Sequence, residues 1–416
     1  MIHVCFCFTD KTGRYSKFVG MSMLSIFENI AAPPPSVTIH ILHDKTLTDD
    51  NRDKFSYVAR HYGQIVNFYN VEELCAEDFA NMTKDNPKLL TDTRFTIGMM
   101  FRIFIPQILS ADIEKAIYLD ADIIVNMDLN ELYQIDLGDK CLAVVPSNSI
   151  AMKKHTHITR HLCVAGLVEP DDYFNSGVLL MNLKLLRNEH RTMMDGINFI
   201  GADPRYTHFD QDVLNYCFTK RILKLPIRFN NSVSFARAKK EKTIGQKIYH
   251  YLGSNHRSFG LNMSDPFNRL WISFFIKTPW FNADSIGRLY SSFQELRRGL
   301  LNSALKVSAA TPGKKRAFFI DPQKEDLMKK IFSIQNDEEI ILAENEDSLK
   351  KLIDAMKTSK DTCTFILTEL FLKKKFPVEL LQKEGFTEGK DFIRGWELLS
   401  EEKGVPFNSY PLVQSL

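Results

Sequence analysis

Two aspartates, Asp120 and Asp122, follow an apolar run at 116–119 and flank Ala121. In an extended chain this spacing places both carboxylates on one face. Carboxylates held this close repel each other unless a cation binds them. Their hard oxygen atoms suit Mg²⁺ or Mn²⁺, which in turn binds phosphate oxygens. The alternative is a strand that ends in a solvated loop with two surface acids, and the pair alone leaves both interpretations open.

Three later segments carry polar side chains that could serve such a site. Segment 174–182 is predicted to be a turn that feeds a buried strand, and segment 209–215 is predicted to begin a helix with acids in its first turn. Segment 248–253 ends a predicted strand at His250. Asp210 is also a reasonable helix cap. A lone histidine is more often structural than a ligand, although imidazole is a good Mn²⁺ partner for two carboxylates.

The elements that must position these residues alternate along the first 255 residues. Apolar, strand-like runs occur at 3–8, 37–42, 65–68, 115–119, 142–146, 178–182, 222–225 and 247–250. Helix-like patterns lie at 17–29, 48–62, 97–109, 183–200 and 211–218. Alternating strands and helices predict an α/β fold with a mainly parallel sheet. Ligands of such sheets bind beyond the carboxyl ends of the strands, where the acid pair stands.

The rest of the chain differs in charge. Residues 256–316 contain ten Lys and Arg against three Asp and Glu, a net charge of +7, and apolar residues at helical spacing predict an amphipathic helix over 286–305. The favoured interpretation is a helix packed between two domains, and the alternative is a surface that meets anionic lipid or an anionic acceptor. We therefore predict a catalytic domain at 1–255, a basic aromatic connector at 256–312 and a small accessory domain at 313–416.

The accessory domain carries its own alternating pattern. Strands are predicted at 316–320, 339–343 and 364–368, with helices at 323–334, 347–357 and 377–383. This predicts a smaller Rossmann-like α/β unit. Its first strand-to-helix turn contains neither a GxGxxG nor a Walker A pattern, so nothing in it supports phosphate binding.

Composition narrows the class of protein. The 416 residues are 44% hydrophobic and 25% charged, with a net charge of +2, which predicts a folded globular protein and argues against nucleic acid as the main partner. The sequence shows no secretory signal and no apolar run of membrane-spanning length. Its seven cysteines form no CxxC pair. These features predict a cytoplasmic protein with reduced thiols.

Taken in order, the DxD pair, the NSGV segment, the DQD segment and the HYxG segment resemble glycosyltransferase family 8. The resemblance covers about residues 1–280. It implies a retaining, metal-dependent transferase of the GT-A fold that uses a UDP-hexose. It also implies that Mn²⁺, or Mg²⁺, is bound by Asp120, Asp122 and His250.

The resemblance also assigns donor contacts. It places Gln211 beneath the reacting carbon, with Asp210 and Asn175 beside it as the catalytic set. The further donor-binding residues that it implies are Phe8, Thr9, Asp10, Arg102, Ala121, Ser176 and Gly253.

The sequence departs from the family pattern at three places. His256 stands where members carry a lysine that holds the diphosphate, with Arg257 as the neighbouring cation, so either side chain is a candidate for that role. The loop after Asp10 is longer and more basic than usual. Ser147 and Asn148 stand where many members carry an acid.

The implied function is transfer of a hexose, galactose rather than glucose, from the UDP-sugar to a hydroxyl of a glycan acceptor. The acceptor is lipid-linked glycan, lipopolysaccharide core or glycoprotein, and segment 284–316 is the candidate contact with the inner face of a membrane. One alternative is a haloacid-dehalogenase-like phosphatase, which would want Thr or Val where Ile124 stands and has no use for the later segments. Another is a catalytically degenerate UDP-sugar-binding protein.

Overall fold

The computed structural model describes residues 1–86, 97–147, 161–203, 205–206, 208–252, 264–283, 287, 315–320, 325–342, 346–359, 362–367 and 376–394. The chain divides into two units, Met1–Asn282 and Ala283–Leu416, each with its own core. The predicted three-part division stays a prediction, because most of 284–314 lies outside the described residues, including the predicted helix over 286–305 apart from residue 287.

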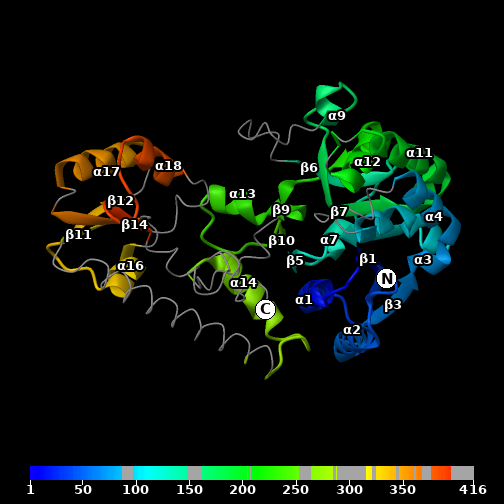
Figure 1. Ribbon diagram of the computed structural model, residues 1–416. Coiled ribbons are helices and arrows are strands. Elements are labelled where there is room, and N and C mark those ends of the chain that lie inside the picture. Colours follow the sequence, from blue (N-terminus) through cyan, green and yellow to red (C-terminus); the bar gives the residue numbers. More distant parts are fainter. Residues whose placement is uncertain are drawn as a thin grey trace. The chain divides into compact units, whose positions relative to one another are not determined.

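A seven-stranded sheet forms the centre of the first unit (Figure 1). Its order is β3 (Ile65–Asn70), β2 (Val37–His43), β1 (Ile2–Cys7), β4 (Lys115–Leu119), β7 (Phe174–Asn182), β6 (Leu142–Pro146) and β8 (Ile222–Lys224). Strand β7 runs antiparallel to both neighbours, whereas the other strands share one direction. The predicted mainly parallel α/β sheet is therefore confirmed.

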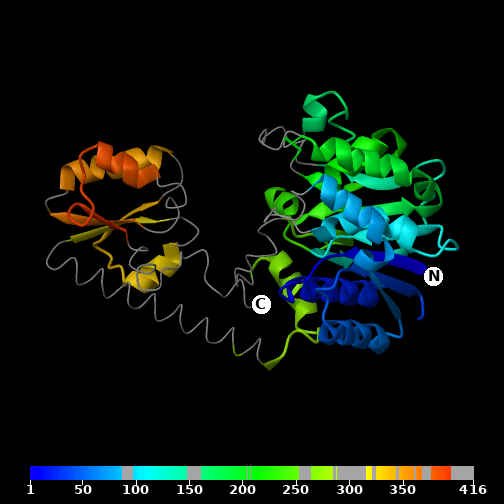
Figure 2. The same ribbon diagram turned by 45° about the vertical axis from the view of Figure 1, so that its right-hand side comes forward.

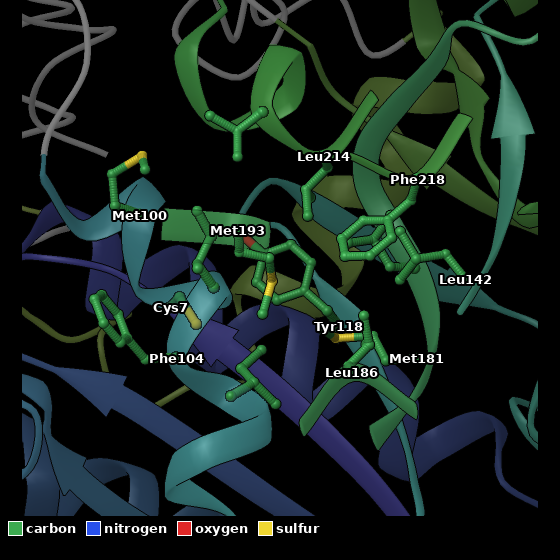
Figure 3. Close-up of a cluster of buried hydrophobic side chains, with 14 of the residues drawn as sticks. Cys7, Met100, Phe104, Tyr118, Leu142, Met181, Leu186, Met193, Leu214 and Phe218 are labelled. Atoms are coloured by element: carbon green, nitrogen blue, oxygen red, sulfur yellow. The ribbon is translucent and has the colours of Figure 1, made fainter. Parts of the chain in front are cut away.

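The central strands of this sheet are buried on both faces, as their continuous apolar runs require. Alternate residues of β1 and β4, such as Cys7 and Tyr118, enter a core with side chains from the helices on that face, and Figure 3 shows this cluster. The intervening residues, such as Phe6 and Ile117, are equally buried on the other face.

Along the sequence, helices alternate with the strands of the first unit. They are α1 (Arg14–Asn29), α2 (Asp49–His61), α3 (Val71–Leu74), α4 (Ala76–Asp85), α6 (Ile105–Ile108), α7 (Asn130–Tyr133), α9 (His161–Val164), α10 (Leu183–Leu186), α11 (His190–Gly201), α12 (Phe209–Phe218), α13 (Val233–Ala238) and α14 (Pro266–Phe275). Short 3₁₀ segments lie at η1 (Ile97–Phe104), η3 (Arg187–Glu189), η4 (Thr219–Arg221) and η5 (Ile227–Phe229).

Two predicted elements take a different form. The helix expected over 97–109 is a 3₁₀ segment followed by α6, where Pro106 in the first turn lacks the N–H that a continuous helix would need. The turn expected at the start of segment 174–182 is strand, because β6 continues to Pro146 and pairs there with Phe174.

A second, three-stranded sheet has the order β5 (Ile123–Asn126), β10 (Lys247–His250) and β9 (Asn231–Ser232). Sequence patterns predicted only β10. Strand β5 begins directly after the acid pair and runs antiparallel to β10, with Ile123 opposite His250. This pairing brings the histidine beside Asp122, which is more than a hundred residues away in the sequence.

Part of the predicted connector packs within the first unit. Trp271 of α14 is buried and lies edge-on to Phe18 of α1, with 6.2 Å between ring centroids. The indole N–H of Trp280 donates to Asn51 Oδ1 at 2.8 Å. None of the helices in the described part of the chain is long and apolar enough to cross a membrane.

The second unit has a four-stranded parallel sheet in the order β12 (Glu339–Leu342), β11 (Lys315–Ile320), β13 (Cys363–Leu367) and β14 (Phe392–Arg394). Figure 2 shows α17 (Glu346–Ser359) and α18 (Phe376–Lys383) on one face and α16 (Glu325–Phe332) on the other. The two faces have separate cores, built on Phe319 and on Phe318. The predicted smaller α/β domain is therefore confirmed as a fold.

Candidate active site

Three chain segments converge at the end of β4. Asp120 follows this strand, and its backbone N–H donates to the Gly177 carbonyl of β7 at 2.8 Å. Since β7 runs antiparallel to β4, the beginning of β7 lies at the same edge as the end of β4. His250 ends β10, and the N–H of Tyr251 donates to the Asp122 carbonyl at 2.9 Å. The sheet edge thus joins the residues that the sequence patterns single out.

The two acids and the histidine form a cluster of potential metal ligands. Their ligand atoms all lie within 4.8 Å of one another. His250 Nε2 is 3.1 Å from Asp122 Oδ1 and 3.7 Å from Asp120 Oδ2. Burial lowers the pKa of His250, but the Asp122 and Asp120 carboxylates outweigh burial and raise that pKa above its ordinary value. Two carboxylates and an imidazole suit a divalent cation such as Mn²⁺.

Gly177 leaves the room that this cluster needs. A Cβ built on Gly177 would lie 2.2 Å from His250 Cε1 and 2.8 Å from Asp120 Oδ2. Any side chain here would push the imidazole or the carboxylate out of place. The residues present therefore fit a bound divalent cation, both in donor chemistry and in the space kept for the donors.

Asp120 is oriented by two hydrogen bonds to one of its oxygens. Oδ1 accepts from the Tyr118 hydroxyl at 2.6 Å and from Arg102 at 2.9 Å. Burial raises the pKa of Tyr118 well above its ordinary value, so this hydroxyl keeps the proton that it donates. Oδ2 is left on the His250 side, which makes it the atom available for a metal.

Arg102 connects the acid pair to the start of α12. Its guanidinium is buried, bonds Asp120 on one side and lies 3.1 Å from Asp210 Oδ2 on the other. It also donates to the carbonyl and hydroxyl oxygens of Ser176, both at 3.0 Å, and lies 4.2 Å from the centre of the Tyr118 ring. Burial alone would lower the pKa of Arg102, but the Asp210 and Asp120 carboxylates beside it help to raise it overall.

Asp210 and Gln211 lie in the first turn of α12, where their side chains face β7. Asp210 is not the helix cap, because His208 holds that position and the carboxylate instead faces Arg102. Burial raises the pKa of Asp210, and the nearby guanidinium opposes that rise. Gln211 Oε1 accepts from Asn175 Nδ2 at 3.0 Å and from the Ser176 N–H at 3.1 Å.

The amide nitrogen of Gln211 is also bound. It donates to the Tyr173 hydroxyl at 2.9 Å, and that hydroxyl donates to Asp212 at 2.7 Å. The Gln211 side chain is therefore held by contacts at both its oxygen and its nitrogen, which leaves it little freedom to rotate.

The predicted uridine segment lies at the end of β1. Phe8, Thr9 and Asp10 are all buried. The Asp10 carboxylate accepts from the N–H groups of Tyr15 at 3.0 Å and Ser16 at 2.9 Å, so it satisfies two donors in the first turn of α1, whose N-cap position Gly13 holds. This structural role was not predicted, and the uridine role of the segment stays a prediction.

The remaining predicted residues divide into two groups. Ala121 is half-buried in the turn between the two acids, where it sets their spacing. Gly253, His256 and Arg257, the predicted diphosphate residues, lie outside the described residues, so their roles also stay predictions.

Four residues join the site without having been predicted, namely Tyr118, Tyr173, Gly177 and Asn230. Gly177 stands inside the NSGV segment and Tyr118 in the apolar run before the acid pair, where the two-residue spacing of a strand could have placed it on the face of Asp120. Asn230 carried no such signal. It lies between η5 and β9, and its amide bonds both His250 and Asn175.

The acid pair and histidine at the edge of a mainly parallel sheet, beside a buried Arg–Asp pair, fit a glycosyltransferase of the GT-A fold. A solved structure titled as the galactosyltransferase LgtC in complex with donor and acceptor sugar analogs superposes with a TM-score of 0.54, over 69% of this chain and 99% of that one. Their sequences are 21% identical, so this likeness concerns the fold.

The chain belongs to glycosyl transferase family 8, whose family model matches residues 3–256. It is 25% identical over 242 residues to the lipopolysaccharide 1,3-galactosyltransferase of Salmonella typhimurium, covering 56% of this chain and 67% of that protein. It is 30% identical over 149 residues to a lipopolysaccharide 1,2-glucosyltransferase of Escherichia coli K12, covering 35% of this chain and 42% of that protein. The predicted family is confirmed, which favours the transferase over the phosphatase.

Proposed function

We propose that this glycosyltransferase moves a hexose from a UDP-hexose to a hydroxyl of a glycan acceptor with retention of configuration. The observation that carries the proposal is the cluster of Asp120, Asp122 and His250 beside the buried Arg102–Asp210 pair. The first group suits a metal-bound diphosphate, and the second offers buried polar atoms to a sugar.

Asp120 Oδ2, Asp122 Oδ1 and His250 Nε2 are the atoms that would hold the cation. When bound there, Mn²⁺ or Mg²⁺ supplies positive charge that stabilises the departing UDP. Tyr118 and Arg102 fix the orientation of Asp120 in advance. His256 or Arg257 is the proposed second cation at the diphosphate.

The donor hexose is proposed to lie against Arg102, Asn175, Ser176, Asp210 and Gln211. Gln211 is uncharged, and its Oε1 already accepts two hydrogen bonds, so it is a poor nucleophile. This supports displacement at the front face of the sugar. The acceptor oxygen bonds to the anomeric carbon as the bond from that carbon to the phosphate oxygen breaks, and the acceptor proton passes to the departing phosphate oxygen.

We propose galactose as the donor sugar and lipopolysaccharide core as the acceptor. Two relatives act, by their names, on lipopolysaccharide, which supports this acceptor class; one is a galactosyltransferase and the other a glucosyltransferase. Lipid-linked glycan and glycoprotein are the other acceptors to test. The +7 charge of 256–316 supports a peripheral contact with the cytoplasmic face of a membrane through 284–316.

The test is UDP release from UDP-galactose and UDP-glucose, measured with Mn²⁺, with Mg²⁺ and after chelation, followed by mass spectrometry of the products on a panel of glycans. We expect Asp122→Asn to lower turnover at least 100-fold, because it removes one ligand charge. Asp139→Asn, at an exposed acid outside the cluster, is the control.

Full turnover by Asp122→Asn would contradict the proposed metal role. Mn²⁺-dependent UDP binding without turnover on any acceptor would instead support the degenerate binding protein. Hydrolysis of p-nitrophenyl phosphate would support the phosphatase.

A further inference from the structure

A line of side-chain amides runs from the metal cluster to the start of α12. His250 Nδ1 is 2.9 Å from Asn230 Oδ1, Asn230 Nδ2 is 2.8 Å from Asn175 Oδ1, and Asn175 Nδ2 is 3.0 Å from Gln211 Oε1. Asn230 is only 6% exposed. It precedes β9, whose Ser232 pairs with His250, so the pairing of β9 with β10 holds the two side chains together.

Two backbone N–H groups fix the direction of every bond in this line. Gly177 N–H donates to Asn175 Oδ1 at 3.1 Å, and Ser176 N–H donates to Gln211 Oε1 at 3.1 Å. A backbone N–H can only donate, so both accepting atoms must be oxygens. The Asn175 amino group therefore faces Gln211, and its oxygen faces Asn230.

The same logic extends to the histidine. Asn230 must present its amino group to the Asn175 oxygen, which turns its own oxygen toward His250. An amide oxygen only accepts hydrogen bonds, so the ring nitrogen facing it must carry a proton. Nε2 also faces an acceptor, Asp122 Oδ1 at 3.1 Å, and donates to it while the ring is doubly protonated. When the ring loses one proton and Asn230 keeps the other on Nδ1, the lone pair is left on Nε2, between Asp122 and Asp120. A metal ligand needs that bare nitrogen.

We propose that Asn230 is a positioning residue with two tasks. Its oxygen holds His250 in the tautomer that can bind a metal through Nε2. Its amino group ties that histidine to Asn175, and through Asn175 to Gln211, so the position of the metal ligand is coupled to the residues proposed to contact the donor sugar. This inference rests on the proposed metal role of His250.

Two substitutions separate the two tasks. Asn230→Leu removes both the oxygen and the amino group. Asn230→Asp keeps an oxygen that accepts from His250 Nδ1 but turns a second oxygen toward Asn175 Oδ1, where a donor stood. Asn268→Leu is the control, because Asn268 is equally buried but lies on α14, where it accepts from Arg237.

The first measurement is calorimetric titration of the full chain with Mn²⁺ alone. We expect Asn230→Leu to weaken Mn²⁺ binding about 10- to 100-fold, the usual effect of losing the residue that hydrogen-bonds a metal-binding histidine. We expect Asn230→Asp to bind Mn²⁺ at least as tightly as the wild type, yet to lower kcat about tenfold or more. Wild-type Mn²⁺ affinity in Asn230→Leu, or equally weakened affinity in both variants, would overturn the proposal.

The second measurement is ¹⁵N NMR of histidine-labelled, metal-free protein at alkaline pH, where the ring is neutral. We expect the His250 signals, assigned with His250→Gln, to show Nδ1 protonated in the wild type and in Asn230→Asp. A wild-type ring protonated on Nε2 would overturn the inference. If Asn230→Leu does not fold, as judged by circular dichroism, this measurement and Asn230→Asp still decide.

The inference and the proposed function fail in different ways. Asp122→Asn that binds Mn²⁺ like the wild type would refute the metal cluster itself. Asp122→Asn that loses Mn²⁺ binding, together with Asn230→Leu that keeps it, would refute only the role of Asn230.

Discussion

Asp120 illustrates how a single side chain is divided between two tasks. One oxygen is occupied by Tyr118 and Arg102, and the other is left for the space shared with His250. The buried Arg102 guanidinium also faces Asp210, so one positive charge balances the carboxylates of both Asp120 and Asp210. A buried ion pair of this kind costs desolvation, and its contribution is mainly to fix geometry.

At this scale Gly177 gives the sharpest prediction. Its Cα lies so close to His250 that an added Cβ would fall 2.2 Å from Cε1. We expect Gly177→Ala to displace the imidazole, to weaken Mn²⁺ binding at least tenfold and to lower the free energy of unfolding by about 1–3 kcal/mol, the usual cost of overpacking. Calorimetry and urea unfolding measure the two effects.

Gly245→Ala is the matched control for this substitution. A Cβ at Gly245 would meet its nearest neighbour at 3.8 Å, an ordinary contact. Unchanged Mn²⁺ affinity in Gly177→Ala would mean that the cluster does not need this close approach.

The sequence identified most of the candidate site because its polar residues interrupt apolar runs. Asp120, Asn175 and His250 all stand at the ends of strands whose burial makes a polar residue conspicuous. Tyr118 was hidden because a tyrosine inside an apolar strand looks like core. Asn230 was hidden because its partners come from β10 and β7, and no local pattern reports contacts made across the fold.

Among the elements, buried strands were the easiest to predict. The bounds of β4, β6 and β10 match the predicted ranges at both ends, because apolar runs covered on both faces stop where burial stops. Strand β5 was missed because a single turn separates it from β4, so the two read as one apolar run broken by acids. Strand β9 has two residues, too few for any periodicity.

Strands β1, β2 and β3 carry a second polar line that bears on stability. His40 Nε2 is 3.0 Å from His3 Nδ1, and His40 Nδ1 is 3.0 Å from the Tyr69 hydroxyl. Burial, helped by the neighbouring His3, lowers the pKa of His40 to about 3. In the unfolded chain this histidine would titrate near 6.5, so below that pH the unfolded state binds an extra proton and is favoured.

We therefore expect the first unit to lose stability as the pH falls from about 6.5 toward 3. By pH 5 the loss from His40 alone is roughly 2 kcal/mol, at about 1.4 kcal/mol for each pH unit. His40→Gln removes this titration, so its free energy of unfolding should depend less steeply on pH over that range. Urea unfolding followed by tryptophan fluorescence measures both proteins, and identical slopes would contradict the assignment.

At the scale of the whole molecule, the chain combines two α/β units with separate cores. Every candidate-site residue that the structure describes lies in Met1–Asn282, and the family model also ends within this unit. The second unit has a complete parallel sheet covered on both faces, so it has what a domain needs to fold by itself. Its contribution is therefore expected at the acceptor or the membrane and not at the reacting bond.

Truncation after Asn282 tests this division of labour. We expect residues 1–282 to fold and to hydrolyse the UDP-hexose in the presence of Mn²⁺ within about threefold of the full chain, because the metal cluster and the proposed sugar contacts are retained. We expect transfer to the glycan acceptor to fall more than tenfold, since the basic segment and the second unit are both removed. UDP release without acceptor and product formation with acceptor are measured on the same preparations. Loss of both activities in a folded truncation would show that the second part of the chain serves the donor site, and retention of both would show that acceptor recognition lies within the first unit.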